Sequence, residues 1–482
     1  MEGLPGGHPD PPRPRPRAAG SRPGRSVNGP ARPTLRGAWV LACPLLVAGL
    51  TQVAVNIVDT LMLARVSTDA LGAFALAAPV YFVALIVVRG WATAVQVRVA
   101  RCHGAGRSGE VGRVVRTGLI TSVAAGAALG SVLYAAAPYA LRALGAAGEV
   151  LGPGTGYLRI LALAVPFAAV SFTLQAACAG TGATRAAMYT ALLVNLVNLP
   201  LGLLFIFRAG LGVTGAAFST LAATAAGTGF LLVYCRSRLP RAAGDSAEAA
   251  EATRAEAGRL WRIGWPEMTT LGIGYVNEAL MAGFAARMST HDLAAYRIVD
   301  NLTLVVFTFL GSASTAITIL AGQELGRGDT RGARSWHPTG LRLLLLMLAL
   351  PSASALALGP VLLDRITSDP VVAERAWGAT PVALLSMAPL AAGMAYAALL
   401  RAAGDTRAVL VASVTSDYLL LIPLGWLLGV HAGLGLPGLY LAWTSFAVLY
   451  CALLVPRYRK RFAGKDPAQR AGPPKAPQAD LA

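Results

Sequence analysis

Long apolar runs, separated by short stretches rich in arginine, glycine and proline, are the dominant pattern of this sequence. A helix needs about 20 apolar residues to cross the hydrocarbon core of a bilayer, and most of the runs reach or exceed that length. Runs of this length predict helices that tilt or protrude from the membrane. We therefore expect twelve membrane-spanning helices near residues 41–66, 70–100, 112–142, 155–179, 185–208, 213–235, 261–288, 293–323, 334–363, 378–401, 407–430 and 436–456.

The composition agrees with a chain that has lipid as its solvent. Of 482 residues, 55% are hydrophobic and 13% are charged, and the mean hydropathy is +0.58. The charged share is about half that of an ordinary soluble domain, so it could not cover the surface of one. We expect an all-α integral membrane protein in a lipid bilayer. Residues 1–38 are rich in proline and arginine and lack the apolar core of a signal peptide, so they predict a disordered arm.

The net charge of +18 is distributed in a way that predicts orientation in the membrane. Arginines gather in the N-terminal arm, in alternate turns between the apolar runs and in the C-terminal tail, whereas turns such as Ser67–Asp69 and Ser289–His291 are poor in arginine. Positive charge marks the cytoplasmic side, so both termini are predicted to lie in the cytoplasm and the chain in the cell membrane. The same distribution favours a role in topology over nucleic-acid binding, and we expect no nucleic-acid partner.

An internal repeat divides the chain into two halves. Pro44 and Pro266 are 222 residues apart, and the same offset pairs VSTDALGAFAL with MSTHDLAAYRI, HGAGRSG with LGRGDTR, and GATR with GDTR. With one inserted residue, GLGVTG from Gly210 meets GLGLPG from Gly433. One register held through all of these pairs predicts two six-helix lobes.

Each lobe contains an even number of spans, so both lobes enter the membrane with the same orientation. Parallel repeats of this kind are related by an axis along the membrane normal, and transporters built this way bind substrate between the halves. The segment between the lobes is polar and alanine-rich, which suits a cytoplasmic helical linker. The predicted organisation is a disordered arm (1–38), a first lobe (39–236), a linker (237–260), a second lobe (261–457) and a disordered basic tail (458–482).

Five motifs, through their order and duplication, resemble a known transporter family. They are IVDTLMLARVSTDALGAFALA, ARCHGAGRSGEVGRVVRTG and AGTGATR in the first lobe, and GQELGRGDTRGAR and RAAGDTR in the second. Over about 44–456 the chain resembles the bacterial multidrug and toxic compound extrusion (MATE) transporters. The resemblance implies two six-helix bundles arranged as a V, and the export of organic cations by alternating access against a proton or sodium gradient.

Asp59 is a carboxylate in the outer half of the first apolar run, about 22 Å along the helix from Pro44. Apolar surroundings favour the protonated form of a carboxyl group, so gain and loss of a proton at Asp59 can change which lobe arrangement is favoured. The alternative is an interfacial carboxylate that faces water. The resemblance matches Asp59 with the first-helix acid of the family, and Asn56, one turn earlier, is a candidate for the same cavity.

Asn195 and Asn198 lie about one turn apart in the fifth apolar run. The family pattern has an asparagine and, four residues later, an acid directly before a proline. Here Asn195 and Pro200 match that pattern, but Leu199 takes the place of the acid. Asn195 remains a candidate hydrogen-bond partner of Asp59 in ion coupling. The alternative for both asparagines is a polar link between helices.

The seventh and eighth runs carry further polar candidates. Glu278, beside Asn277, is a candidate coupling or cation-binding acid, and an ion pair with Arg297 is the alternative. Arg297 and Asp300 are three residues apart on one helix face and are expected to neutralise each other. Family members often have glutamine in place of Arg297, and a positive group near the cleft disfavours cationic substrates unless Asp300 or Glu278 masks it.

Two more charged residues lie inside predicted spans. Asp417 is the repeat partner of Asn195 and either lines a cavity or pairs with another group. Arg89 lies in the second run and is expected near its cytoplasmic half, where it pairs or reaches a polar cavity.

Other classes of protein lack their sequence signatures here. No GxxxxGK[ST] phosphate-binding loop occurs, the histidines are too dispersed for a metal site, and no acid–base pair suggests an integral membrane enzyme. Two unlike lobes also offer no symmetric filter for a channel. The nearer alternative is a flippase for lipid-linked precursors with a related two-lobe architecture. A cavity dense in arginine would favour that flippase, whereas a cavity lined by Asp59, Glu278 and Asp417 favours cation export.

We therefore predict a monomeric secondary active antiporter that exports a small organic compound in exchange for protons or sodium. No other cofactor and no bound metal are expected. The identity of the substrate and the choice between the two ions stay open at this point.

Overall fold

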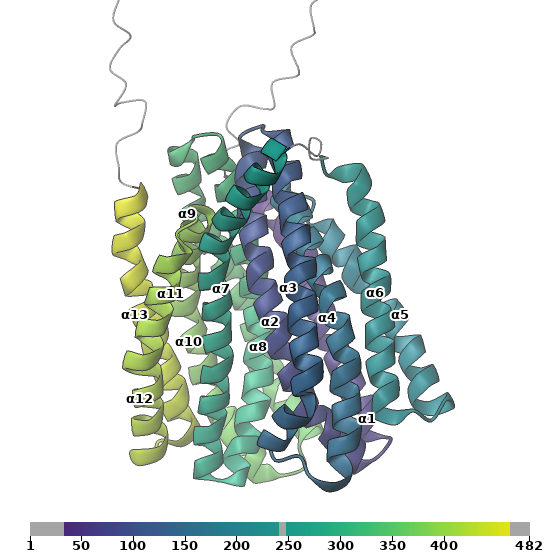
Figure 1. Cartoon of the computed structure of the whole chain (residues 1–482). Helices are drawn as coiled ribbons and strands as arrows, with labels where there is room; N and C mark the ends of the chain where they lie inside the picture. Colours follow the sequence, from purple (N-terminus) through teal and green to yellow (C-terminus); the bar gives the residue numbers. More distant parts are fainter. Residues whose placement is uncertain (1–32, 241–246, 463–482) are drawn as a thin grey trace, which may run out of the picture. The chain divides into compact units, whose positions relative to one another are not determined.

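The computed structural model of the chain describes residues 33–240 and 247–462, and Figure 1 shows long helices that run side by side through this part of the chain. The described residues from Pro33 onward belong to one compact unit. The elements are α1 (Leu35–Ala64), α2 (Thr68–Gly104), α3 (Ser108–Ala143), a 3₁₀ turn η1 (Gly148–Val150), α4 (Leu151–Gly180), α5 (Arg185–Leu203), a π-helical turn η2 (Leu204–Arg208), α6 (Gly212–Arg238), α7 (Ala247–Met288), α8 (Thr290–Gly326), α9 (Thr330–Ile366), α10 (Pro370–Ala402), α11 (Thr406–Ser416), a π-helical turn η3 (Asp417–Leu421), α12 (Ile422–Leu424), a π-helical segment η4 (Gly425–His431) and α13 (Gly435–Phe462).

Each predicted span coincides with one of these helices or with a run of adjoining ones. Within the described residues, eleven segments are long and apolar enough to cross a membrane. The predicted seventh span (261–288) is the exception, because α7 carries Glu267, Asn277 and Glu278 among its apolar residues. The all-α membrane fold is confirmed, and α7 is the helix whose polar content sets it apart.

The ends of three segments differ from the sequence prediction. The helix α1 begins at Leu35, inside the predicted arm, because the side chain of Thr34 accepts a hydrogen bond from the backbone N–H of Gly37 and caps the helix. The last helix continues to Phe462, since Tyr458 and Phe462 pack against the core of the second lobe. The linker is helical from Ala247 and continuous with α7. Predictions for residues 1–32, 241–246 and 463–482 lie outside the described residues.

The internal repeat is visible in the backbone itself. Glycines with positive φ recur at the 222-residue offset, with φ of 70° at Gly106 and 81° at Gly328, and 93° at Gly182 and 73° at Gly404. After the predicted one-residue insertion, the offset becomes 223, and Gly210 (64°) matches Gly433 (68°). Side chains with a Cβ rarely adopt this conformation, so the repeated turns need glycine at these places. The prediction of two equivalent six-helix lobes is confirmed.

The inserted residue lies in the fifth helix of the second lobe, where it alters the local hydrogen bonding. In that lobe, π-helical backbone occurs at η3 and η4, whereas the described first lobe has only η2, the counterpart of η4. An extra residue inside an α-helix is accommodated as a π-helical turn, and such turns are frequent at functional sites. The extra turn begins at Asp417.

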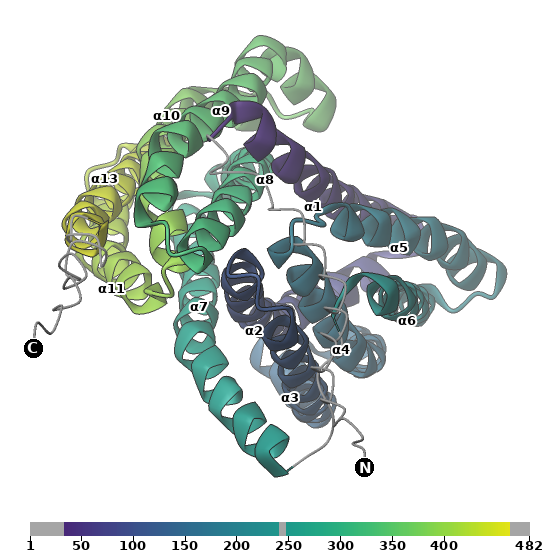
Figure 2. The same cartoon turned by 90° about the horizontal axis from the view of Figure 1, so that it is seen from above.

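Helix packing follows the same two-fold pattern. Contacts of α1 with α5, α2 with α4 and α4 with α6 have counterparts between α7 and α11, α8 and α10, and α10 and α13. Between the lobes, α2 packs against α8, α1 packs against α8, and α7 packs against α2. Figure 2, viewed along the helices, shows α2, α7 and α8 near the centre, with α5 and α6 on one side and α11 and α13 on the other. The four helices α1, α2, α7 and α8 therefore form the boundary between the lobes.

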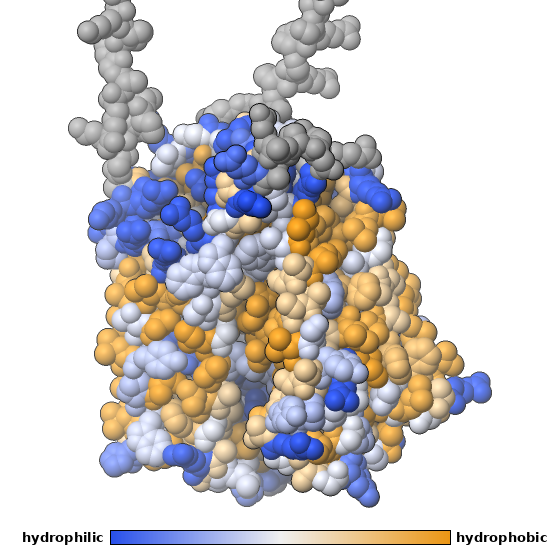
Figure 3. Space-filling view, in the orientation of Figure 1, coloured by the Kyte–Doolittle hydropathy of each residue, from blue (hydrophilic) through white to orange (hydrophobic). Residues whose placement is uncertain are grey.

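We call the end of the bundle that holds the α2–α3 and α8–α9 turns the basic end, and the opposite end the distal end. Arginines gather at the basic end, among them Arg101, Arg107, Arg327 and Arg331. Figure 3 shows apolar residues over the middle of the visible face and hydrophilic residues toward both ends. This distribution is typical of a membrane protein with an apolar belt.

The lobes are joined at the basic end and separate toward the distal end. Buried residues from the first part of α1, including Ala38 and Leu46, belong to a core cluster made otherwise of second-lobe residues. Another mixed cluster joins α2 and α3 to Leu260 and Ile263 of α7. By contrast, the clusters around Leu63 and around Tyr296 each contain residues of one lobe only. The closed side of the structure is therefore its basic end.

Candidate functional site

Asp59 lies five residues before the distal end of α1 and is half-buried. In the described part of the chain, no side chain forms an ion pair or a hydrogen bond with its carboxylate. It lies within electrostatic reach of the buried phenol of Tyr157 on α4, which Tyr81 on α2 also approaches. Asn56, one turn earlier, is half-buried as well. Asp59 is therefore a carboxylate inside a span that has the phenol of Tyr157 within electrostatic reach and no arginine partner among the described residues.

The hydrogen bond of Asn195 among the described residues goes to α1 but not to Asp59, which differs from the expectation. The Nδ2 of Asn195 donates a hydrogen bond to the backbone carbonyl of Thr51 on α1, with a separation of 3.2 Å. Thr51 is eight residues before Asp59, or about 12 Å along the helix. The Asn195 amide thus forms a polar link between α5 and α1. The link lies nearer the basic end of α1 than Asp59 does.

Asn198 forms a second link, within the first lobe. Its side chain is buried and donates to Oγ1 of Thr220 on α6, at 3.3 Å. Leu199, which stands where the family pattern has an acid, is exposed. Within its predicted spans the first lobe therefore has one carboxylate, Asp59, and no second acid on α5.

The second lobe brings two carboxyl groups together. Glu278 on α7 lies within electrostatic reach of Asp300 on α8. The hydroxyl of Tyr296 donates to Oε1 of Glu278 at 2.6 Å, and the Tyr296 ring stacks on Tyr440 with centroids 6.0 Å apart. Two neighbouring carboxylates repel each other when both are ionised, so such a site favours a proton or another cation. We call Glu278 and Asp300 the carboxyl pair.

The geometry of the α7–α8 hairpin explains the carboxyl pair. Glu278 and Asp300 are each eleven residues from Ser289, which caps α8 at the turn. Positions at equal distance from a short turn between antiparallel helices lie at the same height. In the first lobe, the repeat partners of the pair are Asn56 and Ala78, so the paired acids belong to the second lobe alone.

Arg297 is not the partner of either acid, which corrects the expectation for this residue. It is exposed and forms no ion pair within 4.0 Å in the described residues, and its charge acts on Asp300 from a greater distance. The Glu278 carboxylate accepts from Tyr296 instead. Neighbouring positions on one helix face allow an ion pair, but here the acid turns toward α7 and the guanidinium turns outward.

Asn277 and Asp417 face each other between α7 and η3. Asp417 is buried and accepts from the hydroxyl of Ser413 at 3.2 Å. Asn277 is fully buried and turned toward Asp417, but neither its Nδ2 nor its Oδ1 completes a hydrogen bond of normal geometry. The π-helical turn at Asp417 thus directs an acid toward an unsatisfied amide.

Sequence reasoning missed the tyrosines that surround these acids. Tyr296 is four residues before Asp300, so the helical spacing already placed both on one face. Tyr440 and Tyr157 come from other helices, and no local pattern could have connected them to the acids.

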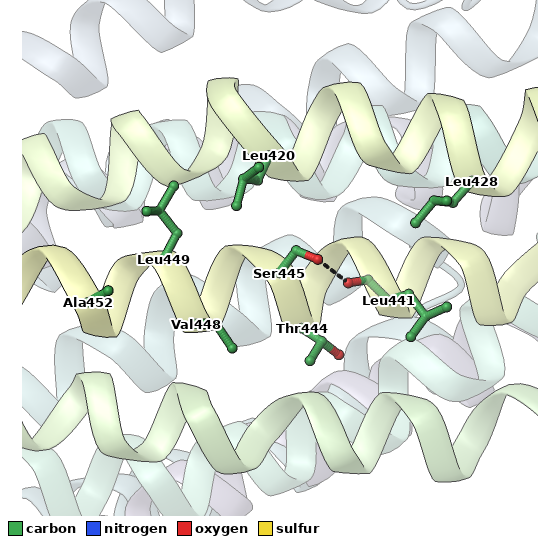
Figure 4. A pocket seen from close by; sticks show the side chains of 8 residues that line it. All are labelled: Leu420, Leu428, Leu441, Thr444, Ser445, Val448, Leu449 and Ala452. Carbon is green, nitrogen blue, oxygen red and sulfur yellow. Dashed lines mark hydrogen bonds between the residues drawn. The ribbon is translucent and has the colours of Figure 1, made fainter.

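A separate apolar groove lies between α13 and the segments η3 and η4, as Figure 4 shows. It has a volume of about 590 Å³ and is lined by Leu420, Leu428, Leu441, Thr444, Ser445, Val448, Leu449 and Ala452. None of these side chains is ionisable. The groove is therefore not part of the acidic constellation.

A family model described as MatE matches residues 44–204 and 272–427, which is more than half of the chain. The two matched segments fall in the two halves of the internal repeat. Similar proteins include the multidrug resistance protein PmpM of Pseudomonas aeruginosa, 26% identical over 470 residues and covering 92% of this chain and 98% of that protein. Another is the probable multidrug resistance protein NorM of Bradyrhizobium diazoefficiens, 28% identical over 440 residues, with 87% and 92% covered.

Solved structures have the same fold. One is an outward-facing multidrug resistance MATE family transporter of the MOP superfamily, with a TM-score of 0.82, 18% identity, and 90% of this chain and 97% of that chain covered. Another is a MOP superfamily transporter from Pyrococcus furiosus, with a TM-score of 0.81, 18% identity, and 89% and 96% covered. These matches agree with the two-lobe architecture described above.

Proposed function

Because this chain belongs to the MatE family of membrane transporters, we propose that it is a secondary active antiporter. It exports small organic compounds, cationic or amphipathic, in exchange for protons or sodium by alternating access. The names of PmpM and NorM refer to multidrug resistance, which supports drug-like compounds as substrates. A transporter of this family needs no catalytic site.

The carboxyl pair carries the proposal. Ionisable groups inside spans are costly and mark ion pathways. The pair and Asp59 lie in helices that border both lobes, and neither Glu278 nor Asp59 is neutralised by an arginine in the described structure. If an ion binds the carboxyl pair more tightly in one arrangement of the lobes than in the other, its binding shifts the equilibrium toward the first arrangement.

The packing of the lobes supports alternating access. The lobes touch at the basic end and are separately packed toward the distal end. We place the basic end in the cytoplasm, because positive charge marks that side of a membrane protein. The arrangement is then an outward-open one.

The decisive experiment measures efflux of a fluorescent organic cation from proteoliposomes while pH and sodium gradients are imposed separately. Asp59→Asn and Glu278→Gln remove the acidic function and keep similar side-chain size. Both variants are expected to abolish gradient-driven efflux and to retain the thermal stability of the parent.

Asp364→Asn is the matched control, because Asp364 is an exposed carboxylate near the distal end of α9. It is expected to transport as the parent does. Full gradient-driven efflux by both Asp59→Asn and Glu278→Gln would overturn the proposal.

A further inference from the structure

Arg89 is an arginine inside a span, and it has no acidic counterpart in the part of the chain that the structure describes. It lies on α2, fifteen residues before the end of that helix, or about 22 Å from the basic end. No carboxylate of the described residues pairs with its guanidinium or acts on it electrostatically. Its described partner is the ring of Phe172 on α4, with 6.0 Å from the guanidinium carbon to the ring centroid. A charge at such a depth normally has a counter-charge, so its absence needs an explanation.

The Arg89 side chain faces the space between the lobes. Ala100, eleven residues further along α2, lies on the same helix face, because eleven residues make about three full turns. A Cβ on Gly322 of α8 would meet the Ala100 side chain at 3.2 Å. The face of α2 that carries Arg89 is therefore the face that packs against α8.

The position opposite Arg89 is open. Ala100 and Gly322 are repeat partners in contact, so the axis that relates the lobes passes between them. Arg89 and Gly311 are also repeat partners, three turns nearer the distal end, and lie across the same axis. A Cβ on Gly311 would meet nothing within 4 Å. Arg89 itself is exposed, so its guanidinium is accessible to a ligand.

We propose that Arg89 binds a carboxylate of the exported compound, in the space beside Gly311. A guanidinium with five N–H donors and no acidic partner is suited to an oxyanion, which it can hold with two parallel hydrogen bonds. This inference rests on the proposed export function and specifies its substrate class as compounds that carry a carboxylate.

The test compares two ligands that differ only in the carboxylate: an aromatic amino-carboxylate and its methyl ester. Binding to the purified full chain in phosphatidylcholine nanodiscs is measured by calorimetry. Arg89→Gln is expected to raise the Kd of the amino-carboxylate by about 10- to 100-fold, because a hydrogen bond to a charged group is lost, and to leave the Kd of the ester within about twofold. Arg89→Lys should restore part of the affinity for the amino-carboxylate.

Arg142→Gln is the matched control, since Arg142 is an exposed arginine at the distal end of α3, away from the cleft. It should leave both Kd values unchanged. Equal losses for both ligands in Arg89→Gln, or no loss for either, would overturn the assignment. The ester binding also reports whether Arg89→Gln is folded.

A second arm repeats the measurement in nanodiscs that contain phosphatidylglycerol. The same carboxylate preference in both lipids supports substrate binding at Arg89. If anionic lipid removes the preference, a lipid phosphate occupies the guanidinium, and the substrate assignment fails. An absence of gradient-driven efflux of any compound would refute the antiport function but would leave these binding results interpretable.

Discussion

Two glycines at the basic end allow α2 and α8 to approach closely, and substitution of either one should open that end. A Cβ on Gly104 would overlap the carbonyl oxygen of Gln323 and lie 2.6 Å from its carbonyl carbon. A Cβ on Gly326 would overlap the carbonyl oxygen of Arg101 and lie 2.9 Å from the backbone nitrogen of Ala105. Gly104 and Gly326 are repeat partners, so the crossing is symmetric about the axis between the lobes.

The cost of one added methyl group can be worked from these contacts. The obstructing atoms are backbone, so the helices must separate by about 1 Å to reach ordinary contact distances near 3.4 Å. Overpacking of this kind costs about 1–3 kcal/mol. Since 1.4 kcal/mol is tenfold in an equilibrium constant, Gly104→Ala should shift the equilibrium toward opening at the basic end by about 5- to 150-fold. Gly326→Ala should have the same effect.

Ser108 and Thr330 are repeat partners beside the crossing. The distance between spin labels at these two positions, measured by double electron–electron resonance, reports the opening of the basic end. Cys43 and Cys451 are half-exposed and would be replaced by serine, whereas the other three cysteines are buried. Gly104→Ala should add a population at longer distance. Because an added Cβ at Gly109 would meet nothing within 4 Å, Gly109→Ala is the control and should leave the distribution unchanged.

If both crossing variants kept the distance distribution of the parent while remaining folded, the close approach of α2 and α8 would have no role in closure. The prediction would also fail if Gly109→Ala opened the basic end as much as Gly104→Ala does. Either result would mean that the close approach of α2 and α8 does not hold the closed arrangement.

Two further predictions concern buried polar groups, and both are checked by thermal unfolding in detergent. Glu256 on α7 accepts two hydrogen bonds from Arg98, at 2.7 and 2.9 Å. Glu256→Gln should therefore lower the free energy of unfolding by about 3 kcal/mol, because it breaks a buried ion pair. The control is Glu110→Gln in the exposed ion pair with Arg107, which should change the free energy of unfolding by under about 1 kcal/mol. Burial by itself raises the pKa of Glu256, but the hydrogen bonds and charges of Arg98 and Arg259 lower it below its usual value of 4.5. The contribution of this ion pair to the free energy of unfolding is therefore present above pH 4.5 and is lost as the pH falls through the lowered pKa. Asn277→Leu removes an unsatisfied buried amide and should raise the free energy of unfolding by about 1–3 kcal/mol. The same substitution should reduce efflux, because Asn277 faces Asp417. An unchanged melting temperature would contradict the predicted gain in stability.

The sequence by itself determined the helices, their number per lobe and the repeat. A bilayer leaves a spanning backbone few alternatives to the helix, so apolar length alone predicts the elements. Glycine turns such as Gly106 and Gly328 recur at one offset, because only glycine adopts their backbone conformation without cost. Asp59, Glu278 and Asp417 were recognisable as candidates, since acids are rare inside spans.

Only the tertiary structure decided which polar groups meet. Asn195 reaches Thr51 instead of Asp59, and Glu278 meets Asp300 and Tyr296 instead of Arg297. Such partners depend on where two helices cross and how each is rotated, and local residue spacing does not contain that information. The same limit applies to Arg89. That it has no carboxylate partner among residues 33–240 and 247–462 becomes visible only when every neighbouring helix is in place.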